Sequence, residues 1–417
     1  MIAALTELLS IESVSGSGDE KYPYGAGPAM ALEHTLALCR RMGFRTKNAD
    51  GHYGYAEIGS GPELIGILAH LDTVPAGSGW TYPPFAGTLS EGRLYGRGAQ
   101  DDKGPVIACI YAMKELLDSG VPLARRIRLI LGQDEETGEW ADMELYKQHE
   151  QLPDCGFTPD GAFPAIFAEK GVLLLKLTAP LAGSGFQSLR GGEAPNMVAD
   201  HCRAVLCDGT CVQETGLTAH GSLPWEGRNA ITALMRRLAA HEAPPPYAGA
   251  YLSLLGDGCF GEGLGCGDLT DDVSGRLSVN PGRIETTDGQ ICLYLDVRYP
   301  VTCGKETVLT RIENAARQLG QTVTCCYENA PLYMEKDGPF MQALLSAYRE
   351  VTGDLSEPIA IGGGTYARVM KNIVAFGPGF PGGANTEHEP NEYITVDDLY
   401  RMKAVYTAAL QKLLAQE

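Results

Sequence analysis

The segment that decides the fold is "RLILGQDEETGEW", residues 128–140. Its apolar run at 129–131 is typical of the end of a buried strand, and the chain then opens into three consecutive acids, Asp134, Glu135 and Glu136. Neighbouring carboxylates repel one another, and each loses favourable hydration where a core strand ends. Because a surface turn needs only one acid, the three together indicate that positive charge binds beside this strand.

The chain around this segment alternates between helical and strand patterns up to about residue 170. We expect helices over 27–44 and 101–120, where the pattern is helical and each stretch ends near a glycine. We expect strands over the apolar runs 63–70 and 125–133. This alternation predicts an α/β sheet with helices on both faces.

From about residue 175 the pattern changes. "RIETTDGQICLYLDVRYP" (283–300) has an Asp-Gly turn between two strand-like runs, which predicts a β-hairpin. A helix over 304–319 and a strand over 321–328 are expected to follow, and "APPPYAGA" (243–250) has the composition of a loop. The middle of the chain therefore predicts an α+β region.

Near residue 333 the α/β pattern returns, with helices expected over 338–351 and 395–415 and a strand over 372–378. A chain of 417 residues is too long for one hydrophobic core. We therefore predict one α/β domain interrupted by an inserted α+β domain. The predicted ranges are 1–174 and 333–417 for the α/β domain and 175–332 for the insertion.

Composition limits the class of protein. With 44% hydrophobic and 20% charged residues the chain is typical of a soluble globular protein, and its net charge of −19 argues against nucleic-acid or anionic-membrane partners. No apolar run approaches the roughly 18 residues of a membrane span. The start has no signal-peptide pattern, and none of the 12 cysteines forms a C-x-x-C pair, so we expect reduced thiols and a cytoplasmic protein.

Four more short motifs lie, like the opening segment, where predicted strands end and open α/β sheets bind ligands. They are "AHLDTVP" (69–75) with His70 and Asp72, "GRGAQDDKG" (96–104) with Asp101 and Asp102, "GFTPDGAFP" (156–164) with Asp160, and "NTEHEPNEY" (385–393) with His388. Each motif alone has an ordinary structural explanation, such as a helix N-cap, a turn aspartate or a solvated loop histidine. The glycines of the second motif do not form a nucleotide-binding fingerprint.

Together these motifs favour a metal site. Two histidines and a set of Asp and Glu residues after strands form the nitrogen and oxygen ligand set of a pair of zinc-like ions. Two divalent cations would compensate the acids of the opening segment. One of its glutamates would bind metal, and its neighbour would accept a proton from the attacking water.

The same motifs resemble those of the M20 metallopeptidases, and within them the PepV-type dipeptidases, which are Xaa-His or carnosinase-like enzymes. The resemblance rests on "GILAHLDTVPAGSGWTYPPF", "GRGAQDDKGP", "GQDEETGEW", "FTPDGAFP" followed by "EKG", "GGGTYAR" and "HEPNE", in that order between residues 66 and 392. It implies a zinc-peptidase-like catalytic domain with a mixed sheet, interrupted by a ferredoxin-like lid domain.

The resemblance also implies roles for the site residues. Two Zn²⁺ ions per subunit, with Mn²⁺ or Co²⁺ as substitutes, would be held by His70 and Asp160 at one ion, Glu136 and His388 at the other, and Asp101 at both. Asp72 would orient His70, Glu135 would be the general base, and the Asp101–Asp102 peptide would be cis.

In the insertion, three residues match substrate-facing positions of the family. Asn196 and His220 would contact the substrate and stabilise the oxyanion, and Arg298 would hold a free C-terminal carboxylate. The loop "IGGGTYAR" (361–368) would add backbone donors near that carboxylate, from Gly363, Gly364 and Thr365.

The resemblance leaves two assembly states. In the family the insertion either dimerises or, when enlarged, acts as a lid. The length of the insertion favours a monomer, whereas the short stretch between Asn196 and His220 keeps a homodimer through the insertion as the alternative.

The expected function is metal-dependent hydrolysis of the amide bond of a small dipeptide with a free C-terminal carboxylate. An N-acyl-amino-acid deacylase or a carboxypeptidase-like enzyme is an alternative, because Arg298 would serve all of these substrates. A non-catalytic binding protein on the same fold is a more remote alternative.

Overall fold

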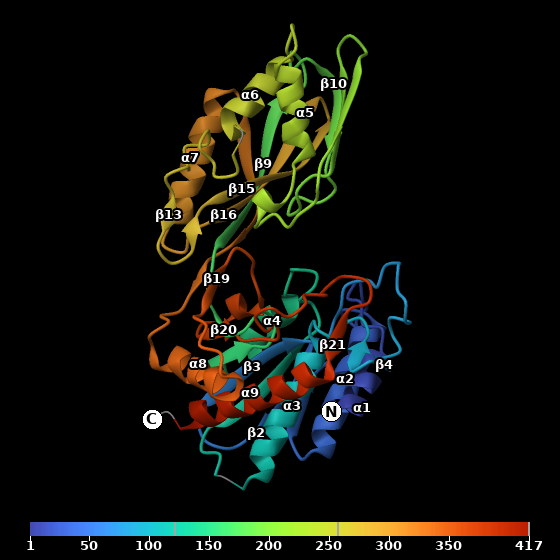
Figure 1. Cartoon of the computed structure of the whole chain (residues 1–417), viewed down its shortest axis with the longest axis vertical. Helices are drawn as coiled ribbons and strands as arrows, with labels where there is room; N and C mark the ends of the chain where they lie inside the picture. Colours follow the sequence, from blue (N-terminus) through green and yellow to red (C-terminus); the bar gives the residue numbers. More distant parts are fainter. Residues whose placement is uncertain (121, 257, 416–417) are drawn as a thin grey trace. The chain divides into compact units, whose positions relative to one another are not determined.

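The computed structural model describes residues 1–120, 122–256 and 258–415, and the chain divides into two compact units (Figure 1). The first unit comprises Met1–Phe167, Met334–Ile359 and Thr365–Glu417, and the second comprises Ala168–Tyr333 and Ala360–Gly364. An α/β unit is thus interrupted by an α+β unit. The predicted domain limits at residues 174 and 333 stay a prediction.

A mixed sheet forms the centre of the first unit, with the strand order β1-β2-β6-β3-β7-β20-β8. Neighbours among β6, β3, β7 and β20 are parallel, and the outer neighbours are antiparallel. The strands are β1 (Arg45–Ala49), β2 (Tyr53–Ile58), β3 (Leu64–His70), β6 (Arg126–Gly132), β7 (Cys155–Thr158), β8 (Ile166–Glu169) and β20 (Ile373–Ala375). The strands predicted over 63–70 and 125–133 are confirmed as β3 and β6, and the strand predicted over 372–378 is confirmed in the shorter β20.

The apolar runs of β3 and β6 follow from burial on both faces of the sheet. Every residue of β3 is buried, as expected for a parallel strand covered by helices on both sides. The neighbouring β7 approaches β3 so closely that a Cβ on Gly156 would lie 2.0 Å from the carbonyl oxygen of Gly66. The centre of the sheet is therefore fixed by close packing.

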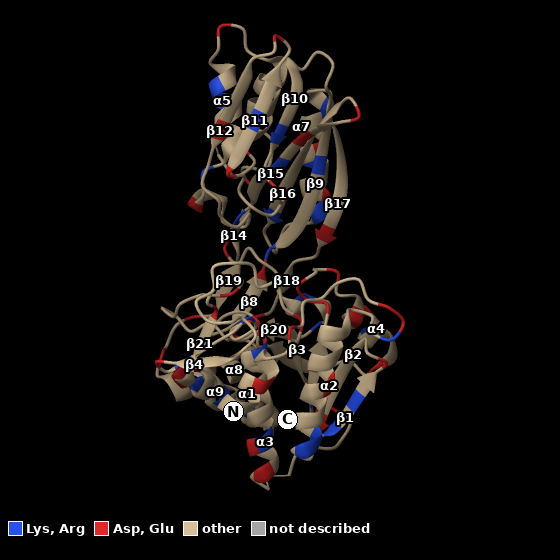
Figure 2. Cartoon of the chain, turned by 90° about the vertical axis from the view of Figure 1, so that its right-hand side faces the viewer, with Lys and Arg blue, Asp and Glu red and all other residues tan. Residues whose placement is uncertain are grey.

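Helices cover both faces of this sheet (Figure 2). They are α1 (Ile2–Leu9), α2 (Ala26–Arg41), α3 (Lys103–Asp118), α4 (Ala141–His149), α8 (Pro339–Thr352) and α9 (Val396–Leu414). Helix α3 packs on β3, β6 and α9, and α9 packs on α8, whereas α2 and α4 pack against β2. The helices predicted over 27–44, 101–120, 338–351 and 395–415 are confirmed.

The first unit also contains short strands and a 3-10 turn in its loops. Strands β4 (Thr88–Ser90), β5 (Arg93–Tyr95) and β21 (Tyr393–Thr395) form a three-stranded sheet in the order β21-β5-β4. A 3-10 turn, η2, spans Tyr366–Val369. Strand β21 lies directly after the "HEPNE" motif, so its pairing with β5 anchors that loop beside the segment that precedes Asp101.

The second unit contains an antiparallel sheet in the order β12-β11-β10-β15-β16-β9-β17. Its strands are β9 (Gly171–Pro180), β10 (Phe186–Gly191), β11 (His201–Leu206), β12 (Cys211–Thr215), β15 (Ser278–Thr287), β16 (Gln290–Tyr299) and β17 (Thr322–Asn329). Its helices are α5 (Ala230–Ala239), α6 (Pro246–Leu255) and α7 (Lys305–Gln318), with a 3-10 turn, η1, at Pro224–Glu226. Four two- or three-residue strands remain: β13 (Thr270–Asp271), β14 (Gly275–Arg276), β18 (Leu332–Tyr333) and β19 (Ile359–Ile361).

The predicted ferredoxin-like arrangement is present within this sheet. Elements β9, α5, β15, β16, α7 and β17 follow in βαββαβ order, and their strands lie as β15-β16-β9-β17. Strands β10 to β12 extend the sheet beyond β15. The hydrophobic core of the unit lies between the sheet and its helices, with residues such as Leu175, Leu234, Tyr251 and Ile312 fully buried.

The predicted hairpin over 283–300 is confirmed as β15 and β16. Its turn residues Asp288 and Gly289 have φ angles of 50° and 73°. A two-residue hairpin turn of type I′ requires positive φ at both positions, and an Asp-Gly pair accepts this. The helix and strand predicted over 304–319 and 321–328 are likewise confirmed as α7 and β17.

The loop predicted over 243–250 is wrong in its second half, because α6 begins at Pro246. Proline at the start of a helix has a suitable φ and needs no hydrogen-bond acceptor for its nitrogen. Burial of Tyr247 and Tyr251 in the core then stabilises the helix despite its glycine and prolines. Among the residues described, no helix combines the length and apolar character that a bilayer crossing requires.

Candidate metal centre

The sheet brings the predicted motifs to one edge. Strands β3, β6 and β7 are parallel neighbours, and His70 at the end of β3 is in register with Gly132 at the end of β6. The acids of the opening segment follow β6 directly, and Asp160 follows β7 by two residues. Side chains far apart in the sequence therefore meet at the carboxyl ends of adjacent strands, where α/β sheets bind ligands.

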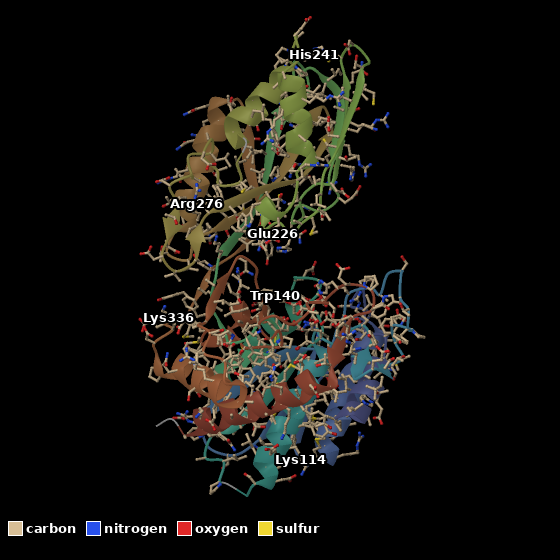
Figure 3. The ribbon with its side chains drawn as sticks, viewed as in Figure 1. Lys114, Trp140, Glu226, His241, Arg276 and Lys336 are labelled. Carbon is tan, nitrogen blue, oxygen red and sulfur yellow. The ribbon has the colours of Figure 1, made fainter. Side chains whose placement is uncertain are left out.

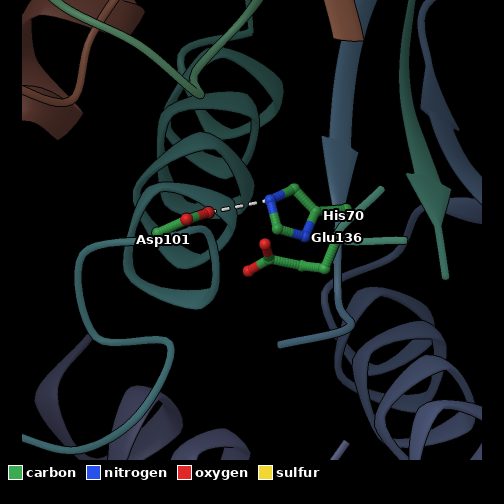
Figure 4. A group of neighbouring side chains, drawn as sticks. All are labelled: His70, Asp101 and Glu136. Atoms are coloured by element: carbon green, nitrogen blue, oxygen red, sulfur yellow. Dashed lines mark hydrogen bonds and ion pairs between the residues drawn. The ribbon is translucent and has the colours of Figure 1, made fainter. Parts of the chain in front are cut away.

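Asp101 lies between the two predicted histidine ligands. His70 Nε2 is 2.9 Å from Asp101 Oδ1, and His388 Nε2 is 2.9 Å from Asp101 Oδ2. His388 Nε2 also lies 3.1 Å from Glu136 Oε2. Figure 4 shows the side chains of His70, Asp101 and Glu136 turned toward one another. Three of the other four predicted ligands, His70, Glu136 and His388, thus lie around the Asp101 carboxylate, and Asp160 belongs to the group described next.

Two overlapping groups in the described part of the chain have ligand atoms close enough to hold a metal ion. One group is His70, Asp101 and Glu136, the other is His70, Glu135 and Asp160, and within each group the ligand atoms lie within 4.8 Å of one another. His70 belongs to both groups. The second group includes Glu135, for which the sequence predicts the role of base, so Glu135 stands within reach of the same site.

The donor set fits divalent cations. Imidazole nitrogens and carboxylate oxygens are the ligands that zinc and related ions prefer. Glu136 Oε1 is buried and has no hydrogen-bond partner among the described residues. Buried polar atoms in native proteins are almost always paired, so an unpaired carboxylate oxygen facing this cluster indicates a missing ligand.

The charges of the cluster are only partly compensated by its own residues. Burial and the charge of Asp160 raise the pKa of Glu135, and burial and the charge of Asp101 raise the pKa of Glu136. Hydrogen bonds to Asp101 and Glu136 raise the pKa of His388 to about 11. The carboxylates of the cluster therefore favour positive charge at its centre, which a bound cation would supply.

Of the three acids in the opening segment, Asp134 has a structural role. It accepts hydrogen bonds from Thr137 Oγ1 at 2.7 Å and from Ala141 N at 3.0 Å, which close the turn before α4. Trp140 (Figure 3) donates from Nε1 to the carbonyl oxygen of Glu135 at 3.1 Å. One acid thus builds the turn, and the other two reach the cluster.

Asp72 is fully buried and connects the two motifs beside it. Its carboxylate lies 3.4 Å from His70 Nδ1 and accepts from the backbone N–H groups of Glu135 at 3.3 Å and Glu136 at 3.1 Å. The carbonyl oxygen of Asp72 is 3.1 Å from the same Nδ1. These contacts place Asp72 where it can orient both the imidazole and the glutamate pair.

The ordinary explanation of the motif at 96–104 as a helix N-cap is confirmed for the position of Asp102 but not for its side chain. Asp102 occupies the N-cap position of α3, but its side chain makes no capping hydrogen bond. It is fully buried and accepts instead from the backbone N–H of His70 at 3.2 Å. The Asp101–Asp102 peptide is cis, as the resemblance implies.

The sequence prediction missed a buried ion pair behind Asp101. Glu392 accepts from Arg97 Nη1 at 2.8 Å and from the backbone N–H groups of Gly98 at 3.0 Å, Gln100 at 2.8 Å and Asp101 at 3.2 Å. Its carboxylate therefore holds the loop that presents Asp101. The position of Glu392 in the motif "HEPNE" could have indicated its role, but only the histidine of that motif was assigned one.

A second missed pair lies beside His70. Tyr366 Oη donates to Asp142 Oδ2 at 2.8 Å, and the backbone N–H of Gln133 donates to the same oxygen at 2.6 Å. The Tyr366 ring stands edge-on to His70, with ring centroids 6.1 Å apart. Burial raises the pKa of Asp142 to about 7. The pair ties the loop after β6 to the loop at 361–368, and no local pattern in the sequence indicates it.

The second unit brings the predicted substrate-binding residues together. Asp296 accepts from Arg298 Nε at 2.7 Å and from Arg298 Nη2 at 2.8 Å, and Gly362 O accepts from Arg298 Nη1 at 2.9 Å. Burial and the nearby charge of Arg298 lower the pKa of His220. Asn196 O accepts from the N–H of Gly221 at 2.7 Å, which places Asn196 beside that histidine.

The glycine-rich loop is divided between the two units. Gly363 and Gly364 belong to the second unit, whereas Thr365 belongs to the first and caps η2 by accepting from Ala367 N. The predicted substrate-binding residues therefore lie in the second unit with the exception of Thr365, and the predicted metal ligands all lie in the first.

The fold and the cluster together define a metal-dependent hydrolase. Comparison with known proteins gives the family: residues 66–412 match Peptidase family M20/M25/M40, and the chain belongs to this family. It is therefore a peptidase, a hydrolase that acts on peptide bonds, which sets aside the non-catalytic alternative. The predicted M20 resemblance and the predicted fold class are confirmed.

Relatives and solved structures agree with this assignment. The chain is 35% identical over 457 residues to "Putative dipeptidase YtjP" of Bacillus subtilis, a match that covers 99% of this chain and 97% of the relative. The aminoacylhistidine dipeptidase of Vibrio alginolyticus is similar in structure, with a TM-score of 0.65 at 14% identity over 98% of this chain and 95% of that one. The YXEP protein of Bacillus subtilis, described as a dinuclear metal-binding peptidase of the M20 family, has a TM-score of 0.55 at 14% identity over 99% and 98% of the two chains.

Proposed function

We propose that this protein is a dipeptidase that hydrolyses the amide bond of dipeptides with a free C-terminal carboxylate. We propose that the reaction requires two bound divalent cations, with zinc as the first choice of metal. The observation that carries the proposal is the position of Asp101, one oxygen of which meets His70 while the other meets His388. A carboxylate between two imidazoles suits a pair of ions that share one ligand. The relative named as a dipeptidase supports the substrate class.

In this proposal His70 and Asp160 hold one cation, Glu136 and His388 hold the other, and Asp101 is bound to both. Bound cations would polarise the scissile carbonyl and lower the pKa of the attacking water. Mn²⁺ or Co²⁺ would fit the same donors, because imidazole and carboxylate also suit these ions.

Glu135 is the proposed general base. It is half-buried, its backbone N–H is held by Asp72, and its carboxylate lies within 4.8 Å of ligand atoms of His70 and Asp160. Burial and the charge of Asp160 raise its pKa, which is the direction that a group needs if it accepts a proton and releases it again near neutral pH. Glu135 would take the proton of the water and deliver it to the leaving amine.

Arg298 is the proposed ligand of the substrate's C-terminal carboxylate. Its guanidinium is held in a fixed plane by Asp296 through Nε and Nη2, and Nη1 points to the glycine-rich loop. A preorganised guanidinium suits a carboxylate, and the N–H groups of Gly363, Gly364 and Thr365 would add further donors. Asn196 and His220 would contact the scissile carbonyl and stabilise the oxyanion.

Paired substrates test this function. Protein reconstituted with Zn²⁺ or Mn²⁺ is given β-Ala-His and several L-dipeptides beside their N-acetylated counterparts and acetyl-amino acids, and released amine is measured with ninhydrin. We expect cleavage of the free dipeptides. Cleavage of the capped compounds alone would replace the proposal with the deacylase alternative, and release of C-terminal residues from longer peptides would favour a carboxypeptidase.

A further inference from the structure

A cavity of about 360 Å³ lies wholly within the second unit, at the start of helix α5. Its volume falls within the roughly 300–1,000 Å³ of small-molecule pockets. Neither the proposed metal ligands nor Asn196, His220 and Arg298 contribute to the lining, so the proposed hydrolysis gives the cavity no role. The lining includes Trp225, Arg228, Asn229, Arg236, Phe260 and Asn280.

Two aromatic rings form one wall of the cavity. Trp225 in η1 and Phe260 are stacked, with ring centroids 6.0 Å apart and ring planes at 29°. The guanidinium carbon of Arg276 lies 3.9 Å from the centroid of Phe260, which helps to hold that ring. Trp225 is nevertheless 51% exposed, although tryptophan is highly buried on average in folded proteins. The wall therefore offers a flat apolar ligand an aromatic surface on which to pack.

The charge of the lining is positive. Arg228 and Arg236 are its charged residues, and no Asp or Glu belongs to it. Glu262 lies close to Gly258 of the lining, but its carboxylate is paired with Arg276 at 3.2 Å. In a chain with a net charge of −19, a cavity with this lining favours an anionic ligand.

Arg228 is the residue best placed to bind such an anion. Its backbone N–H donates to Leu217 O and its carbonyl accepts from Leu217 N, both at 2.9 Å, so its position is fixed. Its side chain is exposed and forms no ion pair with any residue that the structure describes, and Nη2 makes only a long contact of 3.5 Å with Thr215 O. Arg236 has interactions of its own. Arg228 therefore carries the charge that a ligand can balance.

The amide side chains of the lining are already engaged within the unit. Asn229 Oδ1 accepts from the N–H groups of Ile231 and Thr232, at 3.0 and 3.1 Å. Asn280 Nδ2 donates to Met197 O at 2.8 Å. These hydrogen bonds fix the wall, and they leave a guanidinium rather than an amide as the main polar group for a ligand.

We propose that this cavity is a second ligand site, which binds a small organic anion that carries an aromatic ring. Arg228 binds the carboxylate or phosphate of the ligand through charge-assisted hydrogen bonds, and the ring packs against Trp225 and Phe260. The ligand needs no ammonium group, because the lining offers no carboxylate to bind one. This site goes beyond the proposed dipeptidase function and does not depend on it.

Four probes separate the parts of this ligand. They are 1-naphthylacetate, 1-naphthyl phosphate, the neutral 1-naphthylacetamide, and acetate, which lacks the ring. Their affinities for the whole chain reconstituted with Zn²⁺ are measured by isothermal titration calorimetry. We expect at least one naphthyl anion to bind about 10-fold more tightly than the amide and acetate. The tighter of the two anions identifies the ligand as a carboxylate or a phosphate.

Two variants locate the binding. Arg228→Gln should weaken binding of the naphthyl anion about 10-fold and leave that of the amide unchanged, because only the charge-assisted hydrogen bonds are lost. Trp225→Ala should weaken the anion and the amide alike. Arg237→Gln is the matched control, since Arg237 is an exposed arginine of the same helix that lies outside the lining.

Equal affinities of naphthylacetate, naphthyl phosphate and the amide for the wild type would overturn the inference. Equal effects of Arg228→Gln and Arg237→Gln on the binding of the anion would overturn it as well, and so would the absence of binding by both naphthyl anions.

Discussion

At the residue scale, Glu135 and Glu136 are adjacent in sequence but have different surroundings. Glu136 lies 3.1 Å from His388, whereas the charge that most raises the pKa of Glu135 is that of Asp160. The Asp72 carboxylate accepts from the backbone N–H groups of both residues, so the difference between their surroundings does not depend on a flexible turn. In the proposed mechanism Glu136 would bind a cation and Glu135 would accept and release the proton.

The base assignment predicts the behaviour of Glu135→Gln. Because the amide keeps the shape of the side chain but cannot accept the proton of water, kcat should fall by about 10²- to 10⁴-fold. Metal content should stay at that of the wild type, which mass spectrometry checks beside the kinetics. Near-normal kcat would show that another group is the base, and loss of one metal equivalent would show that Glu135 is a ligand.

Glu392 is predicted to stabilise the loop of Asp101 rather than to react. In Glu392→Gln the buried Arg97 loses its charged partner, which costs about 3–5 kcal/mol in comparable buried pairs. We expect a lower unfolding temperature by calorimetry together with weaker metal binding by isothermal titration. Glu389→Gln, an exposed change in the same loop, serves as the control, and equal stability of the two variants would contradict the role given to Glu392.

The residues that could be predicted from the sequence are those that follow strands. His70 and the opening acids are visible because each follows an apolar run, whereas Asp160 lies in a Pro-Asp-Gly turn and becomes a candidate only together with the other motifs. Arg97 and Glu392 could not be predicted, because they are 295 positions apart and only the folded sheet brings them together.

At the element scale, the hairpin β15–β16 and helix α6 show how local signals succeed and fail. The Asp-Gly turn determines backbone conformation within two residues, so the hairpin was predictable. Helix α6 follows two prolines and contains a third and a glycine, which locally favour a loop. Its stability comes from the burial of Tyr247 and Tyr251 against the core of the second unit. Burial of this kind depends on distant elements and leaves no short-range pattern.

Two glycines of the second unit give a matched prediction. A Cβ added to Gly249 in α6 or to Gly289 in the hairpin turn would have no atom within 4 Å. Of the two glycines only Gly289 has a positive φ, which is 73°. Gly249→Ala should raise stability by about 0.5–1 kcal/mol, because alanine favours the helix. Gly289→Ala should lower it by about 1–2 kcal/mol, because a Cβ disfavours that φ. Thermal unfolding of both variants measures the difference, and shifts of the same sign would contradict this account.

At the scale of the whole molecule, the enlarged sheet of the second unit bears on assembly. Strand β15, an edge in the simple βαββαβ arrangement, pairs here with β10 of the same chain, and β11 and β12 extend the sheet further. An edge that is already paired does not offer its backbone to a second copy. This supports the proposal of a monomer.

Light scattering after size exclusion tests that proposal. We expect a mass of 44.6 kDa at micromolar concentration, with or without added metal. A mass of twice this value would favour the homodimer alternative and would direct attention to the two edge strands of the sheet, β12 and β17.

The insertion itself could be predicted from the change in pattern along the chain, but the division of the glycine-rich loop could not. Residues 360–364 belong with the second unit because Lys170 N donates to Ile361 O and Arg298 donates to Gly362 O. Both contacts join segments more than sixty positions apart, so the sequence pattern around the loop gives no sign of them.

Two cations at one site, bound through a shared Asp101, are proposed to be needed for peptide hydrolysis. The most direct measurement is a titration of metal-free protein with Zn²⁺ in which bound metal and hydrolysis of a free dipeptide are followed together. We expect activity to be negligible without metal and to reach its maximum when two equivalents per chain are bound. Full activity at one equivalent, or activity without metal, would contradict it.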